Sequence, residues 1–219
     1  LLSTAVRKQL AADVPVGIFT SGGVDSALLA AMACDSSGPE PPRTFSIGFP
    51  QLQFDETEHA RNLARHLGTR HSTVVADEPV LREALGFLVE KLDEPSADPA
   101  ILPTYLLACA ARDHVTVVLG GEGADELFGG YPTYVGHRIA PAYCKLPRFA
   151  RRAVERFVAC LPASLESKVS LEYLIRRFLD GVELPLSERH MCWFGTGAGE
   201  SVLSPRLLQE YYEPPVFPD

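Results

Sequence analysis

The sequence lacks long hydrophobic runs and has no excess of basic residues. No apolar stretch approaches the roughly eighteen residues that a transmembrane helix needs, and charges interrupt the N-terminal segment too often for a signal peptide. The chain has 20 Lys and Arg residues against 28 Asp and Glu residues, a net charge of −8 that repels nucleic-acid phosphates and anionic membrane surfaces. We therefore expect no nucleic-acid partner, no membrane association and a cytoplasmic location.

Cysteine and histidine are also scarce and scattered. The five cysteines are widely spaced, odd in number and without a CxxC pair, which is typical of reduced thiols in a cytosolic protein. The six histidines form no HExxH motif or other metal-ligand spacing. Neither a disulfide framework nor a zinc site is therefore expected.

What the sequence does contain is an alternation of short apolar strands and amphipathic helices. With 219 residues, 46% of them hydrophobic, the chain can bury a sizeable core. Strands are expected over 14–20, 44–49, 71–76 and just before the glycines at 120, and helices over 3–12, from 54 to a C-terminal cap at Gly68, over 81–92 and over 105–111. This alternation predicts an α/β fold with a mostly parallel sheet sandwiched by helices.

The strand pattern stops after about residue 131, and only helices are expected beyond it. They are predicted near 149–161, 170–180, 186–194 and 204–211. The first of these has an apolar stripe that includes Phe149 and Phe157, and an Arg stripe that is most simply a solvated face. We therefore divide the chain into a core, 1–132, and an all-helical C-terminal appendage, 133–219.

The stretch GIFTSGGVDSALLAAMA joins a buried strand to an apolar helix through two adjacent glycines. Gly22 and Gly23 allow backbone N–H groups to point into a concavity at the start of the helix, where the helix dipole favours phosphate. Ser21 and Ser26 add hydroxyl donors. Asp25 would repel a phosphate unless a cation lay between them, and Mg²⁺ would supply that cation. The alternative is a plain strand–turn–helix in which Ser or Asp serves only as a cap.

A second glycine turn, LGGEGADELFGG, follows the last expected strand. Gly120 and Gly121 open the backbone to a ligand, and three acids, including Glu122 and Asp125, stand within five positions. Helix capping alone would explain one of these acids. Because ligands of parallel sheets bind at the carboxyl ends of the strands, we expect the two turns to face each other and hold a metal polyphosphate, with Asp25 and Asp125 as Mg²⁺ ligands.

Other nucleotide-binding motifs are missing or incomplete. The chain has no GxxxxGK[ST] motif. GTGAGE, at 195–200, lacks the third glycine of GxGxxG and follows a helical segment, so it is expected to be a loop.

Three motifs in order, SGGVDS, FSIGF and GGEGADELFGGY, carry a resemblance to a known family. SGGVDS resembles the pyrophosphate-binding loop of the N-type ATP pyrophosphatases, and the three motifs together resemble the synthetase domain of glutamine-dependent asparagine synthetases. The resemblance covers residues 13–135 most closely and implies an adenine nucleotide alpha hydrolase-like, Rossmann-like fold. It implies an enzyme that adenylates a carboxylate with ATP, releases pyrophosphate and lets an amine attack the acyl-adenylate. For an asparagine synthetase the acid is aspartate and the amine is ammonia.

The resemblance also implies roles for individual residues. Asp25 and Asp125 are the implied Mg²⁺-linked acids, and Glu122 matches the acid tied to formation and use of the aspartyl-adenylate, where a general base could act. The implied ATP contacts are Thr20, Ser21, Gly22, Gly23, Val24, Asp25, Ser26, Ile47, Gly120 and Gly121.

The sequence departs from the family pattern in several places. Gly120 stands where the family usually has serine, which removes one hydroxyl contact. An ARVPFLD-like segment, a downstream lysine and an N-terminal glutaminase domain have no match in this chain. We therefore expect a fragment that receives ammonia from a glutaminase domain missing from it, and a homodimer is left open.

Several alternatives stay open at this point. The β-lactam and carbapenam synthetases use the same adenylation with an internal amine, but a tyrosine would be expected at Glu122. Amidotransferases that modify surface sugars or peptides, including lasso-peptide cyclases, would differ in the acid-binding pocket. A non-catalytic nucleotide-binding scaffold is the alternative of a different class, and the three acids at Asp25, Glu122 and Asp125 argue against it.

Overall fold

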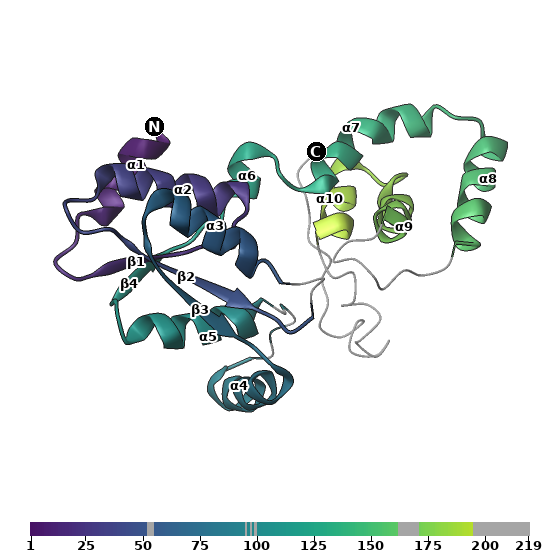
Figure 1. Cartoon of the computed structure of the whole chain (residues 1–219). Helices are drawn as coiled ribbons and strands as arrows, with labels where there is room; N and C mark the ends of the chain where they lie inside the picture. Colours follow the sequence, from purple (N-terminus) through teal and green to yellow (C-terminus); the bar gives the residue numbers. More distant parts are fainter. Residues whose placement is uncertain (52–54, 95, 97, 99, 162–170, 195–219) are drawn as a thin grey trace. The chain divides into compact units, whose positions relative to one another are not determined.

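The computed structural model describes residues 1–51, 55–94, 96, 98, 100–161 and 171–194 (Figure 1). The chain forms two compact units, Leu1–Ala124, called here the sheet unit, and Asp125–Asp219, called the helical unit. No helix of the described residues is long and apolar enough to cross a membrane. The predicted domain boundary between residues 132 and 133 stays a prediction.

The sheet unit is built on four parallel strands, as predicted. In the sheet they lie in the order β3-β2-β1-β4. Their bounds are β1 (Val16–Phe19), β2 (Arg43–Gly48), β3 (Arg70–Val75) and β4 (Val117–Leu119). In the register, Ile18 of β1 lies opposite Leu119 of β4, and Phe19 lies opposite Phe45 of β2. The carboxyl ends of β1 and β4 are therefore neighbours, which brings the segments that follow them to one edge of the sheet.

Helices cover both faces of this sheet (Figure 1). Their bounds are α1 (Leu2–Leu10), α2 (Val24–Ser36), α3 (Thr57–Leu67), α4 (Glu78–Lys91) and α5 (Ile101–Arg112). On the face covered by α2, Ile18 packs with Ala30 and Ala33, and on the face covered by α5, Phe45 packs with Ala111. Gly68 ends α3 in the left-handed conformation, φ 70°, which confirms the predicted cap.

Part of the sheet unit's core is polar. The side chains of Thr44 and Ser46 on β2 are each only 1% exposed. The imidazole of His71 on β3 lies 3.0 Å from the Thr44 hydroxyl through Nδ1 and 3.1 Å from the Ser46 hydroxyl through Nε2. The Thr44 hydroxyl also lies 2.9 Å from that of Thr69. These buried groups therefore satisfy one another.

The described residues of the helical unit contain helices and no strand, as predicted. The helices are α6 (Ala124–Phe128), which begins one residue before the unit, α7 (Pro132–Cys144), α8 (Arg148–Ala159), α9 (Leu171–Gly181) and α10 (Leu186–Phe194). The core contains Ala140, Tyr143, Val182 and Trp193. The sequence analysis did not predict α7. The predicted helix at 204–211 and the predicted loop at 195–200 lie outside the described residues.

The apolar stripe predicted on α8 is not the face that the helix buries. Phe149 and Phe157 are 77% and 68% exposed, whereas Val158 is 3% exposed and Val154 packs against the core. The arginines of the stripe on the same helix are exposed, and the neighbouring Arg151 is partly covered. The stripe is therefore exposed, and its interpretation as a solvated face rather than a phosphate or nucleic-acid surface stays a prediction.

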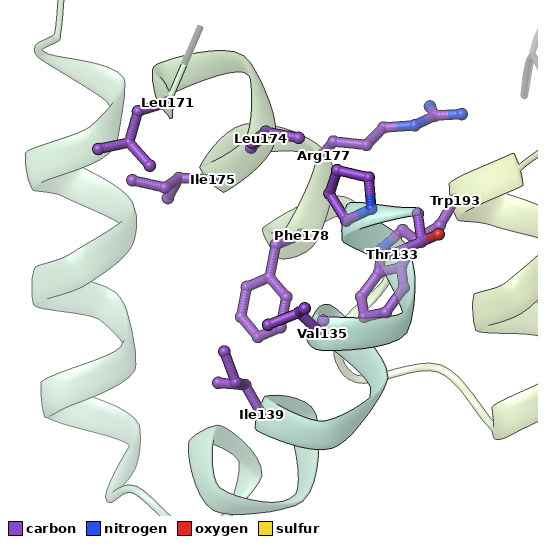
Figure 2. A pocket seen from close by; sticks show the side chains of 11 residues that line it. Thr133, Val135, Ile139, Leu171, Leu174, Ile175, Arg177, Phe178 and Trp193 are labelled. Atoms are coloured by element: carbon purple, nitrogen blue, oxygen red, sulfur yellow. The ribbon is translucent and has the colours of Figure 1, made fainter. Parts of the chain in front are cut away.

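A cavity of about 400 Å³ opens between α7 and α9, with Trp193 of α10 forming part of its wall (Figure 2). Figure 2 shows the apolar side chains of Val135, Ile139 and Phe178 grouped on one side of it. The hydroxyl of Thr133, also in the lining, is buried and has no hydrogen-bond partner among the described residues. The cavity therefore combines a mostly apolar lining with an unpaired hydroxyl group.

Candidate functional site

The first glycine turn follows β1 and is fixed against the start of α3. Gly22 has φ 83°, a conformation that side chains rarely adopt. A Cβ on Gly22 would lie 2.6 Å from Cβ of His59 and 2.8 Å from the backbone nitrogen of Ala60. His59 is an exposed residue of α3, and its close approach to the turn was not expected from the sequence. Gly22 is therefore required both by the backbone angle and by this contact.

Two serines hold the turn in shape. The Ser21 backbone N–H donates to the Ser26 hydroxyl at 3.2 Å, and that hydroxyl donates to the Gly23 carbonyl at 3.2 Å. The Gly23 N–H donates to the Ser21 hydroxyl at 3.2 Å. These bonds define the shape of the turn and occupy the N–H groups of Ser21 and Gly23, so the N–H groups left for a ligand are those that follow at the start of α2.

The start of α2 presents those N–H groups. Its N-cap residue is Gly23, which has no side chain to cap the helix, and the helical bonding begins with the Ala27 N–H donating to the Gly23 carbonyl at 2.9 Å. The first-turn N–H groups of Val24, Asp25 and Ser26 precede this bond and have no intrahelical acceptor. Together with the dipole of a 13-residue helix they fit an anion such as phosphate.

The second glycine turn follows β4 and touches the first. The Ala124 N–H donates to the Gly121 carbonyl at 3.2 Å, which closes a turn with Gly123 at φ 86°. A Cβ on Gly121 would lie 3.4 Å from the Ser26 backbone nitrogen and 3.6 Å from Cβ of Asp25. The two turns thus lie side by side at the carboxyl edge of the sheet, as predicted.

Thr20 and Ile47 lie at the same edge. The Thr20 N–H donates to the Phe45 carbonyl at 2.8 Å, so the chain leaving β1 stays bound to β2. Ile47 is half-buried near the carboxyl end of β2, opposite Val74 of β3. The structure therefore brings Thr20, Ile47, the first turn and Gly121 to one edge of the sheet unit.

Glu122 and Asp125, the two predicted site acids of the second motif, lie in different units. Glu122 is exposed at the corner of the second turn, and one of its carboxylate oxygens lies in the space that a Cβ on Gly120 would fill. Asp125 begins the helical unit, and one of its carboxylate oxygens lies in the corresponding space at Gly130. The sequence analysis did not include Gly130.

Mg²⁺ would need ligands beyond protein side chains. Among the described residues, no group of three or more His, Cys, Asp or Glu side chains could hold a metal ion. Mg²⁺ in nucleotide sites is commonly held by one or two carboxylates together with substrate phosphates. The exposed carboxylate of Asp25, directly after the turn, fits that pattern.

The chain matches known proteins over most of its length. The model of the family described as asparagine synthase matches residues 1–190. The chain is 41% identical over 170 residues to a putative glutamine-hydrolyzing asparagine synthetase of Mycobacterium tuberculosis and 38% identical over 169 residues to asparagine synthetase 1 of Bacillus subtilis. Each match covers 77% of this chain and 26% of the relative, so the chain spans about a quarter of the length of these relatives.

The solved structures that match the chain include two synthetases, each 18% identical to it. NMN synthetase from Francisella tularensis has a TM-score of 0.45, and the match covers 93% of this chain and 96% of that one. Glutamine-dependent NAD+ synthetase from Acinetobacter baumannii, in complex with ADP, also has a TM-score of 0.45, over 82% of this chain and 43% of that one. Because the family model matches residues 1–190 and the two motif turns meet at one sheet edge, the chain belongs to the asparagine synthase family.

Proposed function

We propose that this chain is the ATP-binding, adenylating part of a glutamine-dependent asparagine synthetase. The observation that carries the proposal is the close approach of Gly121 to Asp25 and Ser26, which places the two motif turns side by side at the carboxyl edge of the sheet. Family membership supports the reaction class. The relatives named as glutamine-hydrolyzing asparagine synthetases support aspartate as the acid and glutamine as the source of ammonia.

In this proposal the pyrophosphate end of ATP lies at the start of α2. The uncapped N–H groups after Gly23 donate to phosphate oxygens, while the backbone near Thr20, Ile47, Gly120 and Gly121 contacts the AMP part. Mg²⁺ held by Asp25 and Asp125 would neutralise charge on the phosphates and on the leaving pyrophosphate.

The chemistry takes two displacements. A carboxylate oxygen of aspartate attacks the α-phosphorus of ATP, and the bond from the α-phosphorus to the bridging oxygen breaks to release pyrophosphate. Ammonia then attacks the acyl carbon, the bond to AMP breaks, and the nitrogen loses a proton. Glu122, exposed on the turn beside the site, is the proposed general base for that proton. A glutaminase domain is the proposed source of ammonia.

Pyrophosphate release from Mg-ATP tests this function. The full-length protein is assayed with ammonium and a panel of carboxylates led by aspartate, and AMP and asparagine are measured in parallel. Asp25→Asn is expected to lower turnover by about 10²-fold or more. Asp35→Asn, the same change at an exposed position of α2, is the matched control and keeps wild-type turnover.

Other outcomes would change or reject the proposal. Release with a different acid would keep the adenylation and replace the substrate. ATP binding without release for any acid would reject the enzyme and favour a non-catalytic nucleotide-binding module. A partner protein that binds Asp25→Asn as well as wild type would add to that conclusion.

A further inference from the structure

The sheet unit has a cavity of its own, at the edge of the sheet opposite the two glycine turns. Its volume is about 330 Å³, and its lining comes from the ends of α1 and α2, the segments that lead into β1 and β2, and the start of β3. Because the four strands are parallel, their amino ends share this edge and their carboxyl ends share the other. Along β2 the two edges lie about 15–20 Å apart. This amino-edge cavity is therefore separate from the candidate ATP site.

One wall of the amino-edge cavity is positive. Arg43 and Arg70 are the first residues of β2 and β3, and they pair in register, so their side chains leave the sheet on the same face. Arg43 is half-buried, and its guanidinium has no hydrogen-bond or ion-pair partner among the described residues. Arg70 lies 3.8 Å from Glu40, which is the one acid in the lining. Two arginines against one carboxylate favour an anion, and a guanidinium fork matches a carboxylate group.

The end of α2 forms a wall of the opposite sign. Ser36 and Ser37 line the cavity there, and the Ser37 N–H donates to the Cys34 carbonyl at 3.3 Å. The last turn of this 13-residue helix contains no basic residue, so the partial negative charge of its end is not offset within the helix. The Glu40 carboxylate adds to that charge. This side of the cavity therefore favours a cationic group.

The rest of the lining is apolar. It includes Leu10 at the end of α1, Val14 and Pro42 in the segments before β1 and β2, and Val115 before β4. Val115 is 5% exposed and Val14 is 39% exposed, so the apolar surface runs from the core to the mouth of the cavity. A short aliphatic chain would find contacts along it. The volume lies at the lower end of the range of about 300–1,000 Å³ for small-molecule sites, which indicates a small ligand.

We propose that the amino-edge cavity binds an α-amino acid with a short aliphatic side chain. Its carboxylate pairs with the guanidinium of Arg43, with Arg70 beside it. Its ammonium group lies toward the end of α2 and Glu40, and its side chain contacts Val14 and Val115. Because the cavity is remote from the glycine turns, the bound amino acid is an effector and not a substrate. The inference goes beyond the proposed function and does not depend on it.

Binding of L-leucine to the full-length protein, measured by isothermal titration calorimetry, tests the ligand class. Leucine has an aliphatic side chain and takes no part in the proposed reaction. Leucinamide lacks the carboxylate and N-acetyl-L-leucine lacks the ammonium group. We expect saturable binding of leucine, and a Kd about 10-fold higher or more for each of the two derivatives, since each loses a charge-assisted contact.

Arg43→Gln locates the site. We expect this variant to raise the Kd for leucine about 10-fold or more and to leave the Kd for leucinamide unchanged, because leucinamide has no carboxylate to lose. Arg43→Lys keeps the charge without the fork and is expected to restore part of the affinity. Arg65→Gln, at an exposed position of α3 outside the lining, is the matched control and keeps the wild-type Kd. The midpoint of thermal unfolding without ligand shows that each variant is folded.

The possible results separate this site from the proposed function. No binding of leucine, or an equal Kd in wild type and Arg43→Gln, would overturn the site. Binding of N-acetyl-L-leucine as tight as that of leucine would overturn the amino-acid assignment, because an anion alone would then suffice. Leucine binding that depends on Arg43, in a protein that releases no pyrophosphate with any acid, would support the site and reject the proposed function.

Discussion

In the sheet unit the buried hydroxyls of Thr44 and Ser46 bond with the imidazole of His71, whereas in the helical unit buried polar atoms lie among apolar and aromatic side chains. All six buried side-chain polar atoms without a hydrogen-bond partner among the described residues belong to the helical unit. They include the Trp193 indole nitrogen and the Tyr143 hydroxyl. An unpaired buried group destabilises a fold.

This difference indicates what each unit depends on. The helical unit offsets its unpaired polar atoms with aromatic packing, so its stability depends on the size of a few large side chains. The sheet unit is held by backbone pairing, a polar network and glycines at fixed positions, so it depends on local geometry. Truncation of a large aromatic side chain should therefore destabilise the helical unit, and substitution of a glycine at a fixed position should destabilise the sheet unit.

The largest expected effect is that of Trp193→Ala. Trp193 is 5% exposed, and its ring lies 4.7 Å from that of His137 and 5.5 Å from that of Phe178 between centroids. We expect the free energy of unfolding of the helical unit to fall by about 3–5 kcal/mol. Hydrogen exchange should show lost protection at 132–161 and 171–194, with the amides of β1 to β4 still protected.

The matched control for this prediction is Phe149→Ala. Phe149 is 77% exposed, so its loss should leave the unfolding free energy within about 0.5 kcal/mol of wild type. A Trp193→Ala variant no less stable than Phe149→Ala would contradict the dependence of the helical unit on aromatic packing.

In the sheet unit the sharpest test is Gly22→Ala. The substitution combines a positive φ with a methyl group 2.6 Å from Cβ of His59, and we expect a loss of about 2–3 kcal/mol in unfolding free energy. Gly68→Ala separates the two causes, because Gly68 has φ 70° but open space around it, and it should cost about 1 kcal/mol. Chemical denaturation compares them, and equal losses would show that the contact with α3 adds nothing.

The sequence predicted the sheet unit well because its signals are local. β1 and β4 are short apolar runs that lead into the glycine turns, β2 begins directly after Pro42, and Gly68 marks the end of α3 before β3. The contact of the two turns followed from parallel topology, since strand ends of one sheet share an edge. The contact of Gly22 with His59 did not follow, because it depends on how α3 packs against the turn.

The helical unit was harder to predict because packing overrides local preference. The segment PTYVGHRIAPAYC contains Gly136 and an internal proline, Pro141, both unfavourable in a helix, yet it forms α7. Gly136 allows the Trp193 ring to approach, since a Cβ there would lie 3.0 Å from Cζ3. Pro132, at the start of α7, was the one local signal that favoured a helix.

A smaller effect is expected from pH, through the polar network of the sheet unit. Burial first, and then the nearby positive charge of Arg61, lowers the pKa of His71 below its usual value of 6.5. The unfolded chain therefore binds the proton more readily. The stability contributed by neutral His71 is complete above pH 6.5 and is lost as pH falls from there toward the lowered folded-state pKa.

Denaturation between pH 7.5 and about 5 tests this, with His71→Gln expected to flatten the pH dependence. His66→Gln, at an exposed position of α3, should keep the wild-type curve. In the helical unit, burial first and then Arg189 and His190 lower the pKa of His137, so that unit should still lose stability in acid in the His71 variant. An unchanged slope in His71→Gln would assign the whole effect to other groups.

The smallest expected effect is that of an exposed ion pair in the sheet unit. Arg82 and Glu78 lie one turn apart on α4, 2.7 Å between charged atoms, and their side chains are 78% and 79% exposed. Water and salt screen such pairs, so Arg82→Ala should lower the unfolding free energy by only about 0.3–0.5 kcal/mol. Denaturation at low salt and at about 1 M salt should show this difference vanish. In the helical unit, Arg151 pairs with Glu183 and is only 18% exposed, so Arg151→Ala should cost more and keep most of its effect at high salt, because lost packing of the side chain adds to the lost charge.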